Sequence, residues 1–137
     1  MKGRPDLDRV VRQWVGKAEN DLRNADHTLL MGADCPFDTV CFHAQQCVEK
    51  YLKALLASRS IDFPKIHDIG ELIELLPQSL RPPVAVLDQE KLTYHATVTR
   101  YPGDWEPLVR SDAEEAVAIA RQIRESVRKL LPATVLE

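Results

Sequence analysis

Residues 42–56, Phe42 to Leu56, have the sequence FHAQQCVEKYLKALL, and this stretch decides the fold of the chain. At about 100° per residue, the stretch and the residues before it form a helix with two distinct faces. An isolated helix is only marginally stable in water, so a wide apolar arc must pack against other helices. The rest of the chain is expected to supply those helices. The apolar arc consists of Val40, Ala44, Cys47, Val48, Tyr51, Leu52 and Leu55, extended by Phe37 and Cys41.

The opposite face of this predicted helix carries a polar stripe of mixed chemistry. An aromatic ring, an imidazole, an amide and two ammonium groups within reach of one another would suit an anionic, planar ligand. The alternative is that Glu49 and Lys53 form an i,i+4 ion pair while Gln46 and Lys50 only solvate the helix. The pattern alone favours this second interpretation, because charged clusters are more often structural than functional. The stripe consists of Phe42, His43, Gln46, Glu49, Lys50 and Lys53.

Length and composition predict one globular domain over residues 1–137. Domains commonly have about 100–150 residues, so 137 residues leave no room for a second core. The hydrophobic share of 45% and the charged share of 28% are those of a soluble globular protein. A net charge of −3 argues against broad, nonspecific nucleic-acid binding, although it is compatible with a local basic site.

The N-terminal residues and the cysteines together predict a cytoplasmic protein that is not inserted in a membrane. The start MKGRPD lacks the apolar region of a signal peptide, and no apolar run approaches the ~20 residues that span a bilayer. Cys41 and Cys47 would lie about 9 Å apart along a helix, too far for a disulfide. With Cys35 they make an odd number of cysteines, and we expect Cys41 and Cys47 to be buried in a reducing compartment.

The first half of the chain predicts two long helices. In the first, Asp6 is the expected N-cap, and apolar residues recur at helical spacing as far as Gly32. The second begins near Pro36, which suits a first helical turn, and should continue to about Ser58. Apolar positions of the first helix are Leu7, Val11, Trp14, Val15, Ala18, Leu22, Ala25 and Leu29.

The second half predicts one short and two further long helices. Asp68 with Glu71 resembles a capping box that opens a helix over residues 69–76. A third long helix follows the Arg81-Pro82-Pro83 break and continues to Val98. Ser111 with Glu114 forms a second capping box, and the last helix behind it ends at Pro132. With no alternating strand pattern, the fold class is all-α: an antiparallel up-and-down four-helix bundle with one additional short helix.

Common signatures of cofactor and metal sites are missing from the sequence. The sequence contains neither a Gly-x-x-x-x-Gly-Lys-Ser/Thr loop nor a Gly-x-Gly-x-x-Gly loop, the two common phosphate-binding motifs. We therefore expect no cofactor. His43 and Cys47 are an i,i+4 pair without a third and fourth ligand at recognisable spacing, so we expect no metal. His67 precedes a predicted N-cap and either bonds the helix start or meets a ligand. Beside Arg100, Tyr101 and Trp105 could stack a base or plug the end of the bundle.

Three stretches of the sequence stand out together. The first is AQQCVEKYLKALL at 44–56, the second is HDI at 67–69 leading into ELIELL at 71–76, and the third is RYP at 100–102. Together they resemble the HEPN domain family (higher eukaryotes and prokaryotes nucleotide-binding). The resemblance covers nearly the whole chain, because Ala18, Asp21, Leu22 and Ala25 of the first helix also fit. The run Gln-Gln-x-x-Glu-Lys-x-x-Lys-Ala-Leu-Leu is its specific part.

The resemblance implies an all-α up-and-down bundle that is usually dimeric. Some family members are made beside a minimal nucleotidyltransferase, and some are ribonuclease toxins of toxin–antitoxin modules. In the ribonucleases four to six residues separate an Arg from the His that follows it, whereas here three residues separate Arg23 from His27 and seven separate Arg59 from His67. We therefore expect no catalytic residues. The leading hypothesis is a non-catalytic, homodimeric nucleotide-binding or accessory subunit that acts with a minimal nucleotidyltransferase in a toxin–antitoxin-like module, with a nucleotide or RNA as the candidate ligand. The alternatives are a metal-independent ribonuclease with an atypical Arg/His pair and a structural interaction protein.

The resemblance and the polar stripe lead to the same predicted ligand-binding residues. Lysines three apart share a helix face, and their mutual repulsion favours an anionic neighbour. An arginine can grip a phosphate through paired donors, and a tyrosine ring can stack on a base. The competing interpretation is that Glu49 neutralises Lys53 and that Arg100 pairs with a carboxylate. The predicted ligand-binding residues are Gln46, Lys50, Lys53, His67, Arg100 and Tyr101.

Overall fold

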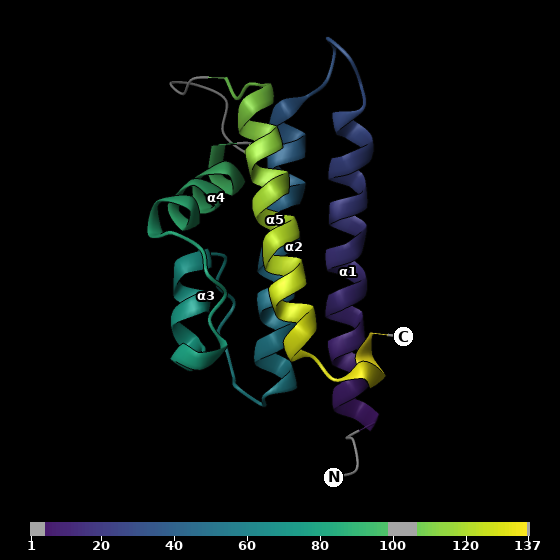
Figure 1. Cartoon of the computed structure of the whole chain (residues 1–137), viewed down its shortest axis with the longest axis vertical. Coiled ribbons are helices and arrows are strands. Elements are labelled where there is room, and N and C mark those ends of the chain that lie inside the picture. The colour runs from purple at the N-terminus through teal and green to yellow at the C-terminus, as the bar shows by residue number, and fades with distance from the viewer. Residues whose placement is uncertain (1–4, 99–106, 137) are drawn as a thin grey trace.

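The computed structural model of the chain describes residues 5–98 and 107–136, with the side chains of 6–94 and 107–136. These residues form five α-helices and two short 3₁₀ helices, and no strand occurs among them. The predicted all-α bundle with one additional short helix is confirmed (Figure 1). In chain order the elements are α1 (Pro5–Leu29), α2 (Phe37–Ser58), α3 (Ile69–Leu75), η1 (Gln78–Leu80), α4 (Val86–Val98), α5 (Arg110–Leu130) and η2 (Ala133–Val135).

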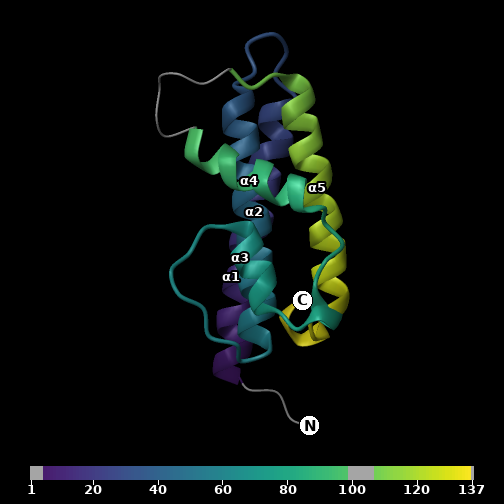
Figure 2. The ribbon, with the colours of Figure 1, turned by 90° about the vertical axis from the view of Figure 1, so that its left-hand side faces the viewer.

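The three longest helices lie along the long axis of the molecule. Helix α1 ascends in the view of Figure 1, α2 descends beside it, and α5 descends again from the same end as α2. Helix α4 follows α3 in the chain and precedes α5. Figure 2 shows α4 lying across the axes of α2 and α5. Helix α2 contacts α1, α3, α4 and α5, so it is the central element of the described chain.

The apolar arc of α2 forms the middle of the core, as its periodicity predicted. Tyr51, Leu52 and Leu55 have no exposed surface. The cysteines at 41 and 47 are buried free thiols, as predicted, and burial raises the pKa of Cys41 to about 12. Helices α1 and α5 close the core with small and β-branched residues. Their buried positions include Val11, Val15, Ala18, Leu22, Ala113, Ala116, Ala120, Ile123 and Val127.

The end of α2 at Ser58 matches its predicted boundary and has a clear backbone cause. Ser60 adopts a left-handed φ of 57°. Its N–H donates to Ala57 O at 3.0 Å, and the N–H of Ile61 donates to Leu56 O at 2.9 Å. This pair of bonds is a Schellman motif, which satisfies the last carbonyls of a helix and turns the chain away.

Two of the three predicted helix caps are wrong. Helix α1 begins at Pro5, so Asp6 lies inside its first turn; proline has a backbone already suited to a first helical position. Helix α5 begins at Arg110 instead of after Ser111, because the Asp112 carboxylate accepts from the N–H of Val109 at 2.9 Å. The third prediction is confirmed: Asp68 caps α3 by accepting from the N–H of Glu71 at 2.9 Å.

None of the helices in the described part of the chain combines the length and apolar character needed to cross a membrane. Helix α4 begins at Val86, two residues later than the first apolar position of the predicted helix. Arg100, Tyr101 and Trp105 lie outside the described residues.

Candidate functional site

A buried carboxylate lies at the centre of the polar stripe of α2. Glu49 is only 3% exposed, and three side chains reach its two oxygens. Lys53 Nζ donates to Oε2 at 3.0 Å, and Gln45 Nε2 donates to Oε1 at 3.1 Å. The third contact is His67 Nδ1, 3.0 Å from Oε2. We call these four residues the Glu49 cluster.

Aromatic side chains cover the lysine of the Glu49 cluster. Lys53 Nζ lies 5.5 Å from the ring centroid of Trp14 and 5.9 Å from that of Phe63. Trp14 comes from α1 and Phe63 from the segment between α2 and α3, and the two rings meet edge to face at 6.2 Å. Cation–π attraction therefore compensates part of the cost of removing the ammonium group from water.

The electrostatics of the Glu49 cluster hold its carboxylate in the charged form. Burial alone would raise the pKa of Glu49, but hydrogen bonds from Lys53, His67 and Gln45 lower it below its usual value. The His67 side chain is 61% exposed, whereas the carboxylate it contacts is 4% exposed. Because Nδ1 faces Glu49, Nε2 is the ring nitrogen that remains for a ligand. The arrangement can bind a polar group or exchange a proton.

A second carboxylate cluster joins α1 to α2. Asp21 of α1 is 7% exposed, and His43 Nδ1 lies 2.8 Å from its Oδ1. Lys50 Nζ donates to the other oxygen of the same carboxylate. Both partners come from α2, and their side chains are 26% and 21% exposed. We call these three residues the Asp21 cluster.

A third charged group lies between α1 and α5. Arg124 Nε and Nη2 both donate to Glu19, at 3.0 and 2.7 Å, and Arg128 Nη1 donates to it at 3.3 Å. Arg128 also donates to Tyr51 Oη at 3.2 Å. Burial would raise the pKa of Glu19, but the hydrogen bonds and charges of the two arginines lower it. Burial also raises the pKa of Tyr51 to about 12.

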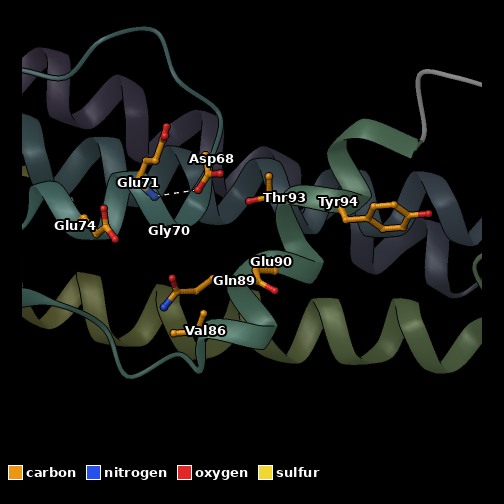
Figure 3. Close-up of a pocket in the computed structure, with 9 residues that line it drawn as sticks. All are labelled: Asp68, Gly70, Glu71, Glu74, Val86, Gln89, Glu90, Thr93 and Tyr94. Atoms are coloured by element: carbon orange, nitrogen blue, oxygen red, sulfur yellow. Dashed lines mark hydrogen bonds between the residues drawn. The ribbon is translucent and has the colours of Figure 1, made fainter.

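A cleft of about 450 Å³ opens between α3 and α4 (Figure 3). Among the described residues, its walls carry four carboxylates and no lysine or arginine, so these walls disfavour an anion such as a nucleotide phosphate. Gln46, Lys50, Lys53 and His67, the predicted ligand-binding residues that the structure describes, are not among those that line it. The lining residues are Asp68, Gly70, Glu71, Glu74, Val86, Gln89, Glu90, Thr93 and Tyr94.

The structure divides the four predicted ligand-binding residues that it describes between two clusters. Lys53 and His67 meet on Glu49, and Gln46 Nε2 joins them indirectly by donating to Gln45 Oε1 at 2.7 Å. Lys50 instead turns to Asp21 of α1. The predicted i,i+4 pair of Glu49 and Lys53 is formed, and both side chains are buried.

Sequence reasoning missed two polar residues at these clusters. Gln45 belongs to neither the apolar arc nor the polar stripe, yet it is fully buried between Glu49 and the carbonyl of His67. Asp21 was noted only as part of a resemblance. A carboxylate among the apolar positions of α1 was the available signal, because a charge facing a core needs a partner.

Similar proteins bear on the interpretation of these clusters. The sequence matches the HEPN domain family over residues 11–130. It is 30% identical to "Putative toxin MJ1304" of Methanocaldococcus jannaschii, covering 90% of this chain and 89% of that protein. Similar solved structures include TT1696 from Thermus thermophilus (TM-score 0.72, 28% identity, 88% of this chain and 98% of the other). Another is ST0689, an archaeal HEPN homologue (TM-score 0.69, 26% identity, 89% and 98%). The chain belongs to the HEPN domain family.

Proposed function

We propose that this protein is a non-catalytic HEPN subunit that binds a nucleotide and acts with a minimal nucleotidyltransferase in a toxin–antitoxin-like module. The observation that carries the proposal is the Glu49–His67 contact. A carboxylate that is 4% exposed holds one nitrogen of an imidazole that is 61% exposed. A histidine oriented in this way presents Nε2 to a ligand at low entropic cost.

The proposed nucleotide site comprises Gln46, Lys50, Lys53, His67, Arg100 and Tyr101. Lys50 and Lys53 each already contact a carboxylate. Their ammonium groups therefore attract an anionic ligand through long-range electrostatics and do not hydrogen-bond it directly. His67 is then the main described contact for a phosphate or a base edge. Arg100 and Tyr101 enter the proposal on the sequence pattern alone, as a phosphate fork and a stacking ring.

The toxin-like context has support from a relative. The relative from Methanocaldococcus jannaschii, which is 30% identical, is named "Putative toxin MJ1304". A toxin–antitoxin module pairs a toxin with a second protein. We propose a homodimer, because C2 pairing is the commonest closed symmetry of soluble oligomers. Sedimentation equilibrium at micromolar concentration should give the dimer mass, and a monomer alone would remove this part of the proposal.

A second candidate function is a metal-independent ribonuclease with an atypical Arg/His pair. The specific observation in its favour is again the carboxylate-oriented imidazole of His67, since general acid–base catalysis needs a positioned proton donor. Against it, Arg23 donates to Asn20 at 2.8 Å and Arg59 to the carbonyl of Leu130 at 3.1 Å. RNA degradation in the presence of a chelator that is abolished by His67→Ala would establish this alternative.

Calorimetric titration of AMP and ATP tests the binding proposal. We expect wild type to bind at least one of them and His67→Ala to bind at least about tenfold more weakly, the scale of a lost hydrogen bond to a charged group. Arg100→Lys should also weaken binding, because it keeps the charge but loses the fork. His27→Ala changes an exposed histidine on α1 and serves as the matched control. No binding by wild type, or equal loss in the His67 and His27 variants, would contradict the proposal.

A further inference from the structure

The cleft between α3 and α4 combines exposed apolar surface with negative charge. We call it the acidic cleft. Its volume of about 450 Å³ lies within the range of about 300–1,000 Å³ that binding sites commonly have. Glu71 and Glu74 line it from α3, and Val86 and Glu90 line it from α4 (Figure 3). Among the residues that the structure describes, it shares none with the proposed nucleotide site, so a ligand bound there would be a different one.

Helix α4 carries apolar side chains on two faces. Leu92 is buried in the core, whereas Val86 is 67% exposed and Leu87 is 63% exposed. Tyr94 is also exposed. At 3.6 residues per turn, these three side chains lie roughly 120–160° around the helix axis from Leu92. A helix that is apolar on both faces usually packs against something on both, so the outer face of α4 is suited to a partner.

The outer face of α4 places a carboxylate between apolar side chains. Val86, Glu90 and Tyr94 follow one another at i,i+4 spacing, so they form one row about 12 Å long. All three line the acidic cleft. The row therefore offers apolar contact and negative charge in alternation.

Neighbouring side chains in the described part of the chain do not neutralise the glutamates of the acidic cleft. Within those residues, Glu71, Glu74 and Glu90 form no ion pair. Lys91, which follows Glu90, pairs instead with Glu115 of α5 at 3.2 Å. Like charges that share a cleft repel one another, and a cationic ligand relieves that repulsion. The acidic cleft therefore favours a ligand with more than one positive charge.

The two walls of the acidic cleft are held in place without a ligand. The N–H of Ile69 on α3 donates to Thr93 Oγ1 on α4 at 3.1 Å. Gly70 lets the walls approach closely, because a Cβ there would lie 3.2 Å from Gln89 Oε1. Gln89 is itself fixed, since its Nε2 donates to the carbonyl of Val84 at 2.9 Å. A preformed cleft loses less conformational entropy when it binds a ligand.

The surroundings of the carboxylates select one class of cation. A metal ion needs converging ligands, and within the described residues no three His, Cys, Asp or Glu side chains are placed to hold one. A polyamine would contact the carboxylates but leave Val86 and Leu87 uncovered. A peptide that alternates basic and aliphatic side chains uses both features, and complementary charge fixes its register. We propose that the acidic cleft docks a short segment of a partner protein in which lysine or arginine alternates with aliphatic residues.

Fluorescence anisotropy of the labelled hexapeptide KLRVKL tests the proposal. We expect wild type to bind it in the micromolar range and to bind it more weakly as salt is added. The peptide KSRSKS keeps the basic residues but lacks the aliphatic ones, and it should bind at least about tenfold more weakly. Val86→Ser should weaken the binding of KLRVKL about threefold. Glu74→Gln/Glu90→Gln should weaken it at least about fivefold, because each exposed ion pair that is lost contributes a factor of up to about five.

The matched control is the double variant Glu114→Gln/Glu125→Gln. It removes the same charge from two exposed positions of α5, neither of which lines the acidic cleft. Its affinity for KLRVKL should stay within about twofold of wild type, because salt screens charges that lie outside the cleft.

Three results of the peptide titrations would overturn the proposal: no binding of KLRVKL by wild type, equal losses in the two double variants, or equal affinity for KLRVKL and KSRSKS. Sedimentation equilibrium tests the other occupant, a second copy of this chain. Wild type and Glu74→Gln/Glu90→Gln should have the same mass, and a lower mass in the variant would overturn the assignment to a partner protein. The titrations use neither a nucleotide nor a His67 variant, so this proposal and the nucleotide proposal can fail separately.

Discussion

The Glu49 cluster and the Asp21 cluster contain the same three kinds of group and differ in which one reaches solvent. Each has a buried carboxylate that contacts one lysine and one histidine. In the Asp21 cluster the histidine and the lysine are both about a quarter exposed. In the Glu49 cluster the lysine side chain is 7% exposed and the histidine side chain is 61% exposed.

The difference arises from where the partners lie in the chain. Asp21 is on α1 and its partners are on α2, so the cluster uses all its groups to join two helices. Glu49 and Lys53 lie on the same helix, and the cluster instead anchors His67 from the segment before α3. The same three kinds of group therefore join two helices in one place and leave a solvent-exposed imidazole in the other.

Removing the Glu49 carboxylate should have the largest effect on stability. Glu49→Ala leaves the buried ammonium of Lys53 unpaired, and breaking a buried ion pair in this way costs about 3–5 kcal/mol. Urea denaturation should show this loss in the free energy of unfolding. The double variant Glu49→Leu/Lys53→Met is the control, because it removes both charges and should be more stable than the single variant. A double variant as unstable as Glu49→Ala would show that packing dominates there.

Shortening a buried apolar side chain of α2 provides a reference for the loss of stability expected from Glu49→Ala. Leu55 has no exposed surface and belongs to the core. Leu55→Ala should lower the free energy of unfolding by about 2–5 kcal/mol through lost burial and the cavity left behind. An unchanged thermal midpoint would show that the apolar face of α2 is assigned wrongly.

Acid should weaken the Glu49 cluster. The pKa of Glu49 is lower in the folded protein than its ordinary value of 4.5, so the unfolded chain binds more protons between the two values. The stability that this carboxylate contributes is therefore present above about pH 4.5 and is lost as the pH falls through the folded pKa. Glu49→Gln should show a flatter dependence of unfolding free energy on pH below about 5. The pKa of Glu19 is also lowered, so some dependence should remain.

The Asp21 cluster should show the smallest effect. Asp21→Asn keeps the shape and removes the charge, while the partly exposed His43 and Lys50 can turn to water. We expect a loss of about 1 kcal/mol in the free energy of unfolding. A loss as large as that of Glu49→Ala would contradict the distinction between the two clusters.

The sequence predicted the helices of the core well because burial imposes a period on them. The apolar arc of α2, from Val40 to Leu55, is buried throughout, and the Schellman motif ends the helix at the predicted Ser58. Caps were predicted less well. The start of a helix can shift without any change in its apolar pattern. A hydrogen bond from the N–H of Val109 to the Asp112 carboxylate shifts the start of α5, and the proline at position 5 shifts the start of α1.

The candidate site could be predicted only in part, because its burial depends on loop segments whose sequence has no helical or strand periodicity. Nothing in the spacing of Glu49 and Lys53 indicates that the rings of Phe63 and Trp14 cover Lys53. The pairing of Lys50 with Asp21 also requires the relative rotation of two helices. His67 was identified, because a histidine directly before a helix cap is visible in the sequence.

The most direct test of the ligand-facing role of His67 is the side-chain ¹H–¹⁵N spectrum of the histidines during nucleotide titration. With ATP, or whichever nucleotide calorimetry identifies, the account predicts that the Nε2 resonances of His67 shift progressively while those of His43 stay unchanged. The resonances can be assigned from His67→Gln and His43→Gln. A nucleotide that shifts His43 and leaves His67 unchanged, or that shifts both equally, would contradict the account.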